Sequence, residues 1–560
     1  MNQNVSSTPI SEPKVAGNMM QTPLMVIDLL HYAAQRFPDQ EIVSRLHNNS
    51  IHRSTYVQTL KRTAQLAHVL AKLGVKDGDF VASMAWNTHR HVELYYAVAG
   101  VGAVLHTVNP RMFSEQIEYV INHANDRFVF VDLGFVEQLE QSVNKLPCVE
   151  AYIIMCSEHE MPATKLPKAL CYEQLLNAES DYFDWPLLNE NQAGSLCYTS
   201  GTTGNPKGVL YSQRSMVLHA QASAGPALLD LKEDTVLLPM VAMYHVGAWG
   251  APYAAPLAGC KLVLPGHGMD GASMWQLIQS EGVNVGLGVP TIWLTLHNYL
   301  VEQGITELPL QRVCVGGAAS PLGLVKTFDQ RYNIYWQPIW GMTETGPLVT
   351  SLPPSKPLLA LPAHERYQKQ TTAGKACFGI EMEIFDTDDQ PLPHDGEHSG
   401  ELRVRGPWIC SSYFKVNDAD KFPGGWLATG DIAVIDREGH MKVVDRTKDV
   451  IKSGGEWISS LEIESIVSQH EAVNECCVIG VKHPKWDERP LLLVVPNAGF
   501  TVTAELMKTH LAGRIAKWWM PDDLVIVEQL PRTGTGKVVK KDLRDTYADY
   551  LVTGEAKTQK

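Results

Sequence analysis

Ten consecutive positions, 199–208, bring together the residue types that bind phosphate groups. The stretch CYTSGTTGNPKGVLYSQRS (Cys197–Ser215) places three glycines, four hydroxyl residues and one lysine in those positions. Glycine lets backbone N–H groups approach a phosphate, and lysine adds a positive charge. The spacing differs from the P-loop pattern G-x-x-x-x-G-K-[ST], because Lys207 is followed by Gly208 and not by a hydroxyl residue. The loop therefore predicts a nucleotide-phosphate site of another kind, with a plain surface turn as the alternative.

Four further motifs follow this loop in order along the chain. They are WGMTETGP at 340–347, ATGD at 428–431, DRTKDVIKSGGEWIS at 445–459 and PRTGTGKVVKKDLR at 531–544. The set closely resembles the adenylate-forming superfamily, which contains the acyl-CoA synthetases, the luciferases and the peptide-synthetase adenylation domains. The resemblance covers the chain from about residue 22 and points in particular to the bacterial medium- and long-chain fatty acyl-CoA synthetases.

The resemblance implies a reaction in two steps. A carboxylate oxygen attacks the α-phosphorus of ATP, which gives acyl-AMP and pyrophosphate, and the thiol of CoA then displaces AMP. Because two anions meet in the first step, catalysis must come chiefly from positioning and from neutralising charge. The implied cofactors are ATP and Mg²⁺, with CoA as a co-substrate.

At the phosphate end of the nucleotide, the resemblance gives catalytic roles to Lys207 and Thr343 and makes Glu344 the magnesium ligand. Magnesium prefers carboxylate oxygens alongside substrate phosphates, so the residue type suits the role. The loop residues that would cradle the β- and γ-phosphates are Thr199, Ser200, Gly201, Thr202, Thr203 and Gly204.

At the adenosine end, the resemblance places Trp340 and Gly341 against the adenine. The segment GGAAS, which contains Gly316 and Ala318, would line the adenine and acyl sites, where small residues allow close approach. Asp431 in TGD would bind both ribose hydroxyls. Taken alone, an aspartate after a glycine is more often a residue that forms a turn. The place of Asp431 in the series of motifs is what favours a ribose-binding role over that alternative.

The resemblance also gives roles to two neighbouring motif residues, one in contact with the nucleotide and one at a hinge between the domains. Arg446 resembles the ribose- and phosphate-contacting arginine of the family, and Lys448 falls at the hinge position. The chain departs from the pattern of some members at Trp457, where they carry a nucleotide-contacting arginine. That contact is therefore absent here or made differently.

The hinge matters because one site must serve two reactions. The small C-terminal domain is expected to rotate, presenting Lys537 of GTGK for adenylation and the face containing Lys452 and Gly455 for thioester formation. For Lys452, a solvated surface lysine is the alternative.

The stretch Pro239–Gly266 resembles the acyl-binding region of the fatty acyl enzymes. Trp249 aligns with a tryptophan that gates an acyl tunnel, and His245 would lie near the carboxylate of the acid. The surrounding residues are apolar or small, which favours a monocarboxylic acid with an apolar body. Chain length stays open, and a short, branched, aromatic or thioether-containing acid would suit the same chemistry.

The elements that must position these motifs follow from length and pattern. A chain of 560 residues exceeds the size at which one core stops growing, so two or more domains are expected. Short apolar runs such as RFVFVDL, AYIIM, TVLLPMV and RVCVGG alternate with helix-length segments, among them 55–74 and 271–282. This alternation predicts α/β layers with largely parallel strands.

Past about residue 375 the pattern changes. GELRVRG and DIAVIDREGHMKVVDR predict an antiparallel or barrel-like piece, with a turn at Gly439. We therefore expect an α/β fold: a large N-terminal domain of layered sheets with a β-barrel-like part, and a small mobile α+β C-terminal domain. The expected divisions are a loose tail at 1–20, the N-terminal domain at 21–445, the hinge at 446–448 and the C-terminal domain at 449–560.

Composition bounds the partners. A net charge of -14 argues against a nucleic-acid partner, because such a partner needs a basic footprint. No apolar run is long enough to span a bilayer, so small-molecule substrates and a cytosolic location are expected, with at most transient membrane association. The ten scattered cysteines fit reduced thiols better than disulfides or zinc. The resemblance allows a homodimer, which no residue pattern demands.

Other functions stay open. A peptide-synthetase adenylation domain would normally be followed by a carrier domain, and only a short tail follows Lys537. A luciferase-like oxidation shares the first step and is disfavoured but not excluded by the motifs. A non-catalytic nucleotide or acyl-CoA sensor of the same fold is the alternative from another class, against which the intact motif residues argue.

Overall fold

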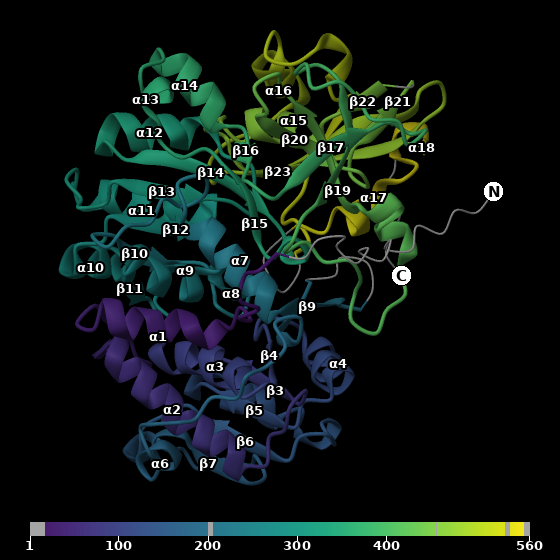
Figure 1. The fold of residues 1–560 in the computed structure, drawn as a ribbon. Coiled ribbons are helices and arrows are strands. Elements are labelled where there is room, and N and C mark those ends of the chain that lie inside the picture. The colour runs from purple at the N-terminus through teal and green to yellow at the C-terminus, as the bar shows by residue number, and fades with distance from the viewer. Residues whose placement is uncertain (1–16, 200–204, 455, 533–537, 554–560) are drawn as a thin grey trace. The chain divides into compact units, whose positions relative to one another are not determined.

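The structure is a computed structural model that describes residues 17–199, 205–454, 456–532 and 538–553 (Figure 1). The chain packs into two compact units. Unit 1 is Met1–Glu381 with Val404–Leu427, and unit 2 is Met382–Arg403 with Ala428–Lys560. The expected hinge at 446–448 falls within unit 2, and it stays a prediction.

Unit 1 contains a seven-stranded sheet in the order β7-β6-β5-β3-β4-β8-β9. Its neighbours are parallel except for the antiparallel pair β8 and β9, which carries the phosphate loop between its strands. The strands are β3 (Phe80–Met84), β4 (Val104–Thr107), β5 (Phe128–Val131), β6 (Ala151–Ile154), β7 (Ala169–Cys171), β8 (Ala193–Tyr198) and β9 (Gly208–Ser212).

A second sheet of unit 1 has nine strands in the order β16-β15-β14-β13-β12-β10-β11-β1-β2. Its centre, from β1 to β14, is parallel, and this agrees with the buried apolar runs of the sequence. The strands are β1 (Glu41–Arg45), β2 (Ile51–Thr55), β10 (Val236–Pro239), β11 (Lys261–Leu264), β12 (Val285–Gly288), β13 (Arg312–Val315), β14 (Tyr335–Gly341), β15 (Leu348–Ser351) and β16 (Lys375–Ala376).

Helices cover these two sheets (Figure 1). The helix expected within 55–74 is α2, which begins in a capping box of Thr55 with Gln58 and is followed by Gly74 at φ +79°. The helices of unit 1 are α1 (Val26–Arg36), α2 (Tyr56–Lys72), α3 (His89–Gly100), α4 (Ser114–Ala124), α5 (Val136–Glu140), α6 (Tyr172–Asn177), α7 (Gln213–Ala224), α8 (Val246–Trp249), α9 (Ala251–Ala258), α10 (Gly271–Glu281), α11 (Pro290–Glu302), α12 (Leu322–Tyr332), α13 (Lys356–Leu359) and α14 (Ala363–Gln370).

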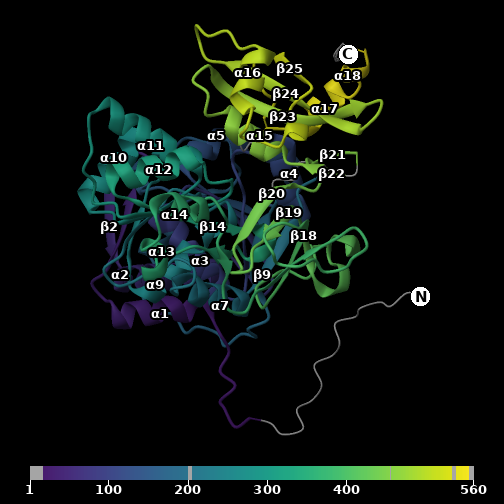
Figure 2. The same cartoon turned by 90° about the horizontal axis from the view of Figure 1, so that it is seen from above.

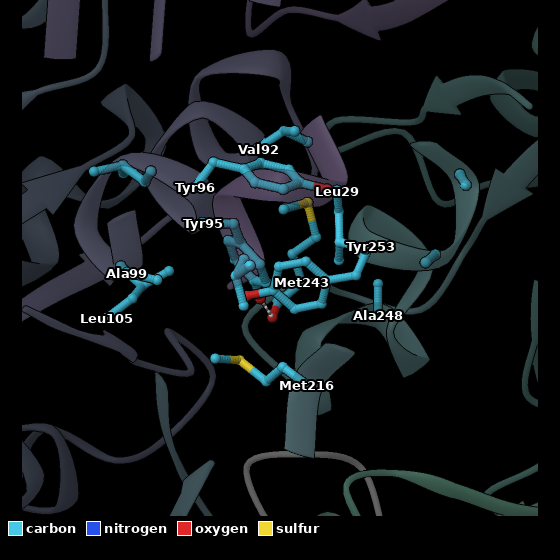
Figure 3. Close-up of a cluster of buried hydrophobic side chains, with 14 of the residues drawn as sticks. Leu29, Val92, Tyr95, Tyr96, Ala99, Leu105, Met216, Met243, Ala248 and Tyr253 are labelled. Atoms are coloured by element: carbon cyan, nitrogen blue, oxygen red, sulfur yellow. Dashed lines mark hydrogen bonds between the residues drawn. The ribbon is translucent and has the colours of Figure 1, made fainter. Parts of the chain in front are cut away.

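One large hydrophobic cluster of unit 1 contains α3, in which every residue is buried. Figure 3 shows Tyr95 and Tyr96 of this helix beside Tyr253 of α9, together with Met216 and Met243. The two helix tyrosines satisfy their hydroxyl groups on backbone carbonyls, at 2.5 Å from Met243 and 2.6 Å from Pro252. Buried aromatic rings with bonded hydroxyls give the core both apolar area and fixed geometry.

Unit 2 contains strands of two further sheets. One has the order β17-β18-β19-β20, with β17 (Glu381–Phe385), β18 (Ser399–Arg405), β19 (Leu427–Ile435) and β20 (Met441–Arg446). The pair β19 and β20 is antiparallel and Gly439 in its turn has φ +87°, so the predicted hairpin is confirmed.

The other sheet of unit 2 orders β22-β21-β24-β23, and β25 pairs with β24. Helices α15, α16, α17 and α18 accompany this sheet (Figure 2). Its elements are β21 (Ile451–Ser453), β22 (Glu456–Ile458), β23 (Val473–His483), β24 (Asp487–Pro496), β25 (Asp523–Ile526), α15 (Ser460–Val467), α16 (Ala504–Leu511), α17 (Lys540–Tyr547) and α18 (Tyr550–Thr553). The predicted α/β class, with a smaller α+β part toward the C-terminus, is confirmed.

Two expectations from composition can be compared with the described residues. All ten cysteines lie in the described ranges and are free. Among the described helices, none has the length and apolar character needed to cross a membrane.

Candidate active site

The phosphate loop joins β8 to β9, and its base is closed by backbone contacts. The N–H of Thr199 donates to the carbonyl of Lys207 at 2.8 Å, and the N–H of Lys207 donates to Thr199 Oγ1 at 3.3 Å. The antiparallel strands therefore hold both ends of the loop together. Its predicted phosphate-binding residues Ser200, Gly201, Thr202, Thr203 and Gly204 lie outside the described residues.

Lys207 is held by two side chains from the segment after β18. Its ammonium forms an ion pair with Asp418 and lies 5.0 Å from the ring centroid of Tyr413. A lysine facing an aromatic ring and a carboxylate keeps its charge in place near the loop. An anion that binds the loop would compete with Asp418 for this charge.

Tyr413 also contacts the predicted magnesium ligand. Its hydroxyl donates to Glu344 Oε1 at 2.6 Å. Burial, and then the Glu344 carboxylate, raise the pKa of the Tyr413 phenol, so the hydroxyl stays protonated and fixes the carboxylate. Lys207, Tyr413 and Glu344 thus form one connected group, which links the phosphate loop to the TET segment.

The TET segment is a single 3-10 turn after β14, and all three of its residues are buried. Tyr211 of β9 donates its hydroxyl to the carbonyl of Thr343 at 2.6 Å. The N–H of Cys410 donates to the carbonyl of Glu344 at 2.9 Å. The backbone of Thr343 and Glu344 is therefore fixed from two sides, as a prearranged charge site needs.

The predicted adenine-side residues follow the ends of two neighbouring parallel strands. Gly316 comes directly after β13, and Trp340 and Gly341 end β14. A Cβ on Gly341 would lie 2.0 Å from the carbonyl oxygen of Pro347, so only glycine fits there. Trp340 is half-buried, whereas Ala318 is exposed. The carboxyl ends of parallel strands are the usual ligand-binding edge of such sheets.

The predicted acyl gate stands on an unusual stretch of backbone. Val246, Gly247, Ala248, Trp249 and Gly250 all have positive φ, from 47° to 80°. A left-handed conformation costs about 1–2 kcal/mol for each residue with a Cβ, and a β-branched valine rarely adopts it. Strain of this kind persists where the surroundings enforce it, and it clusters at functional sites.

The surroundings of this turn are tightly packed. A Cβ on Gly250 would lie 2.7 Å from His219, and a Cβ on Gly316 would lie 3.5 Å from the Trp249 ring. Burial lowers the pKa of His219 to about 3, so its neutral Nε2 accepts the N–H of Leu348 at 2.9 Å. Trp249 is buried and His245 is half-buried at the start of the turn. The structure thus brings the predicted gate residue next to the glycine predicted to line the adenine and acyl sites.

The predicted ribose ligand lies in unit 2. Asp431 of β19 and Arg446 of β20 are directly opposite across the two strands, and Arg446 Nε is 2.9 Å from Asp431 Oδ1. The Asp431 side chain is 3% exposed and that of Arg446 is 46% exposed. The pair holds one carboxylate oxygen in a fixed direction.

The remaining predicted residues of unit 2 lie after β20. Lys448 is exposed in a turn in which the N–H groups of Asp449 and Val450 both donate to the carbonyl of Arg446. Lys452 is exposed on β21, and its N–H donates to Glu488 Oε2 at 3.0 Å. Gly455 and Lys537 lie outside the described residues.

Sequence reasoning missed two members of this site, Tyr413 and Asp418. They belong to the stretch SSYFKVNDADK, which has no family motif and no regular spacing. Their contacts join residues 69 and 211 positions apart, a separation that a local pattern does not reveal.

Comparison with known proteins agrees with the geometry. The family model described as AMP-binding enzyme matches residues 30–414, and the model described as AMP-binding enzyme C-terminal domain matches residues 462–537. A medium-chain-fatty-acid–CoA ligase of Ectopseudomonas oleovorans is 42% identical over 536 residues, which is 96% of this chain and 98% of the relative.

Two further relatives match over nearly the whole length. A 3-methylmercaptopropionyl-CoA ligase of Ruegeria lacuscaerulensis is 42% identical, over 96% of this chain and 99% of its own. A long-chain-fatty-acid–CoA ligase of Thermus thermophilus is 40% identical, over 95% of this chain and 97% of its own.

Solved structures support the same fold. An anthranilate CoA ligase in complex with anthranoyl-AMP has a TM-score of 0.81 at 23% identity, covering 93% of this chain and 97% of that one. An o-succinylbenzoate CoA synthetase from Bacillus subtilis has a TM-score of 0.76 at 24% identity, covering 94% and 99%. With both family models matched in order and relatives at 40–42% identity aligned from end to end, the chain belongs to the AMP-binding enzyme family.

Proposed function

We propose that the protein is an ATP-dependent fatty acid–CoA ligase. It activates a medium- or long-chain carboxylic acid as acyl-AMP, transfers the acyl group to CoA, and releases AMP and pyrophosphate. The observation that carries this proposal is the 42% identity to a medium-chain-fatty-acid–CoA ligase over 96% of the chain. The connected group of Lys207, Tyr413 and Glu344 supplies the charge that such an activation needs.

In the first step, the protein must hold the triphosphate and neutralise the charge on the departing pyrophosphate. Lys207 stands at the base of the phosphate loop and exchanges Asp418 for a phosphate oxygen. Asp431 orients the ribose, while Trp340 and the glycines 316 and 341 bound the adenine site. Reaction then depends on alignment of the carboxylate with the α-phosphorus, because the protein adds no covalent step of its own.

Glu344 fits a magnesium ion that accompanies the nucleotide. The residue is buried, and among the described residues its Oε1 accepts the Tyr413 hydroxyl, so Oε2 is the oxygen for a cation. One carboxylate together with substrate phosphates is a usual environment for Mg²⁺. The bound ion would neutralise phosphate charge, and Tyr413 would keep the carboxylate facing it.

The acid occupies the region behind the left-handed turn. Trp249 is the gate, and Tyr95, Tyr253 and Met243 form an apolar wall near Gly247 and Ala248 (Figure 3). His245 lies at the start of the turn, at the carboxylate end. An apolar wall favours acids with a hydrocarbon body, each buried methylene contributing about 0.8 kcal/mol.

The second step uses another face of the C-terminal part. Lys537 serves adenylation, and the strand containing Lys452 with the adjacent Gly455 serves the approach of CoA. The turn at Lys448 is the hinge between the two poses.

A second acid has support of its own. The 3-methylmercaptopropionyl-CoA ligase of Ruegeria lacuscaerulensis is as similar to this chain as the medium-chain ligase is. Its acid is also a monocarboxylate with an apolar body, so the same wall accommodates it. The choice between the two acids is a matter of chain length.

A panel of acids tests the proposal. Acyl-CoA formation and pyrophosphate release are measured with C4 to C16 fatty acids and with 3-methylmercaptopropionate, on the wild type and on Trp249→Ala. We expect the highest kcat/KM with a C6 or longer acid, and a changed chain-length profile with an unchanged KM for ATP in the variant. The highest kcat/KM with 3-methylmercaptopropionate would show that this acid, and not a fatty acid, is the preferred substrate. An unchanged chain-length profile in Trp249→Ala would contradict the role of Trp249 as the acyl gate.

Oligomeric state and location complete the proposal. The cytosolic placement and the homodimer rest on the resemblance to fatty acyl enzymes. Light scattering on the purified protein distinguishes a mass near 62 kDa, that of one chain, from twice that mass.

A further inference from the structure

A cavity in unit 1, apart from the predicted nucleotide and acyl residues, lies where five strands of both sheets end. Trp86, Asp132 and Met155 follow β3, β5 and β6 of the seven-stranded sheet, and all three line the cavity. Arg45 ends β1 of the nine-stranded sheet, and His267 follows β11; both also line it. All five strand ends are carboxyl ends.

The cavity lies at the point where the strand order of the seven-stranded sheet reverses. From β3 the chain moves to β4 on one side, and it then returns to place β5 on the other side of β3. In open parallel sheets, ligands bind in the crevice outside the carboxyl ends at such a reversal. No motif of the sequence analysis falls on these residues.

Two side chains that line the cavity hold polar atoms without a partner. Arg45 is 2% exposed and Thr88 is 7% exposed. Among the described residues, Arg45 Nη1 and Thr88 Oγ1 have no hydrogen-bond partner. Thr88 stands at the N-cap of α3 without capping it through its side chain, so the N-terminus of this helix adds its own positive end. Leaving buried donors unpaired is costly, and native structures rarely do so.

The charge of Arg45 has no ion-pair partner in direct contact among the described residues. Its Nη2 donates to the neutral Gln276 at 2.8 Å. Burial lowers the pKa of Arg45, and the charge of Asp270 acts in the opposite direction. Asp270 itself caps α10 by accepting the N–H of Ser273 at 2.9 Å. A buried guanidinium that has no carboxylate in direct contact leaves room for an anion as its counter-ion.

The acidic groups that line the cavity do not supply that counter-ion. Glu160 accepts from Asn48 at 3.0 Å and from Ser157, so both of its oxygens are bonded. Asp132 accepts the N–H of Trp86 at 2.6 Å, and burial raises its pKa to about 7. Near neutral pH, Asp132 is therefore protonated in part of the molecules and can donate a hydrogen bond.

We infer that this cavity binds a small inorganic oxyanion of the phosphate class, held by Arg45, Thr88 and the N-terminus of α3. A ligand that reaches Arg45 and Thr88 is itself enclosed, because both side chains are more than nine-tenths buried. This favours free phosphate over the phosphate of a larger ester. The bound anion would connect β1 to α3, and thus tie the two sheets of unit 1 together.

Titration calorimetry with inorganic phosphate tests the inference on the full chain. The titration is run with α,β-methylene-ATP in excess, so that the predicted nucleotide site is filled, and with chloride held constant. We expect one phosphate per chain in the wild type, and at least a tenfold weaker affinity in Arg45→Gln and in Thr88→Val. Arg437→Gln removes the same charge from an exposed turn of unit 2 and should leave the affinity unchanged.

The thermal stability of the protein gives a second readout, which distinguishes the binding of free phosphate from the binding of a phosphate ester. Phosphate should raise the Tm of the wild type by roughly 1–3 °C, and glycerol 3-phosphate should not. Thr88→Val keeps the shape of the side chain. Its phosphate affinity therefore tests the inference even where Arg45→Gln fails to fold. A wild type that releases no heat with phosphate, or two folded variants that bind as the wild type does, would mean that the cavity holds water only. An equal shift with the ester would overturn the assignment to a free anion.

Discussion

Two ion pairs hold residues predicted to bind ATP, and they are built in opposite ways. In unit 1, the predicted ligand-binding member is the cation Lys207, which is 41% exposed beside the partly exposed Asp418. In unit 2, it is the carboxylate Asp431, which is 3% exposed beside the half-exposed Arg446. A buried group is fixed before the nucleotide arrives, whereas an exposed one must be recruited from solvent.

This difference ranks the residues by how much their loss should cost. Glu344 and Asp431 are buried and held in one direction by Tyr413 and Arg446. Preorganised groups act without reorganisation at the moment of reaction, so removing them costs most. Arg446 and Asp418 are exposed to water and screened by salt, so their loss should cost least.

The largest effect is expected for Glu344→Gln. The amide keeps the shape and the Tyr413 contact but loses the charge for a cation, so acyl-AMP formation should fall about 10²- to 10³-fold. Initial rates of pyrophosphate release over a range of Mg²⁺ concentrations measure this. Tyr413→Phe is the matched control, which keeps the ring beside Lys207 and should lose about 10-fold or less. Equal losses in the two variants would show that Glu344 acts through packing and not through its charge.

Asp431→Asn should follow. If this carboxylate accepts from two ribose hydroxyls, as proposed, its replacement removes charge-assisted bonds, which corresponds to an increase of about 10- to 100-fold in KM for ATP. The KM for the acid should not change, because Asp431 is assigned to the ribose. A change in both KM for ATP and KM for the acid would contradict the assignment of Asp431 to the ribose. As a check, KM for 2′-deoxy-ATP should differ less between the variant and the wild type than KM for ATP does.

Arg446→Gln should have a smaller effect than Asp431→Asn. The arginine is half-exposed, and its loss leaves Asp431 with one fewer partner, so KM for ATP should rise about 2- to 10-fold. Raising the salt concentration should reduce the difference from the wild type. A loss larger than that of Asp431→Asn would reverse the proposed ranking of buried over exposed members.

Asp418→Asn is expected to strengthen the interaction with ATP, in contrast to the preceding substitutions. Freeing Lys207 from its ion pair removes a competitor of the phosphates, so KM for ATP should fall about 1.5- to 5-fold. Inhibition by pyrophosphate should become tighter by a similar factor. An increase in KM would mean that Asp418 orients Lys207 for the nucleotide instead of competing with it.

The regular elements could be predicted well because their signals are local. The run RFVFVDL contains β5, and the helix expected within 55–74 has its cap at Thr55 and its stop at Gly74. The ion pair of Asp431 with Arg446 unites two residues that were each predicted to bind the nucleotide. Their contact follows from the hairpin at Gly439, which was itself predicted.

The rest could not be predicted because it depends on packing between distant segments. Nothing in the sequence around Asp418 indicates that it pairs with Lys207, 211 positions away. The left-handed turn from Val246 to Gly250 includes a valine and a tryptophan, which by themselves disfavour that conformation. His219 lies close to Gly250 and Gly316 lies beside Trp249, so the turn is surrounded by segments that are distant in sequence.

The most direct test of the account is isotope exchange between pyrophosphate and ATP in the absence of CoA. If the protein forms acyl-AMP, labelled pyrophosphate should enter ATP only when a fatty acid is present, and the exchange should be lost in Glu344→Gln. Subsequent addition of CoA should convert the intermediate to acyl-CoA with release of AMP. Exchange without any added acid, or no exchange with any acid of the panel while ATP still binds, would contradict the assignment as an acid–CoA ligase.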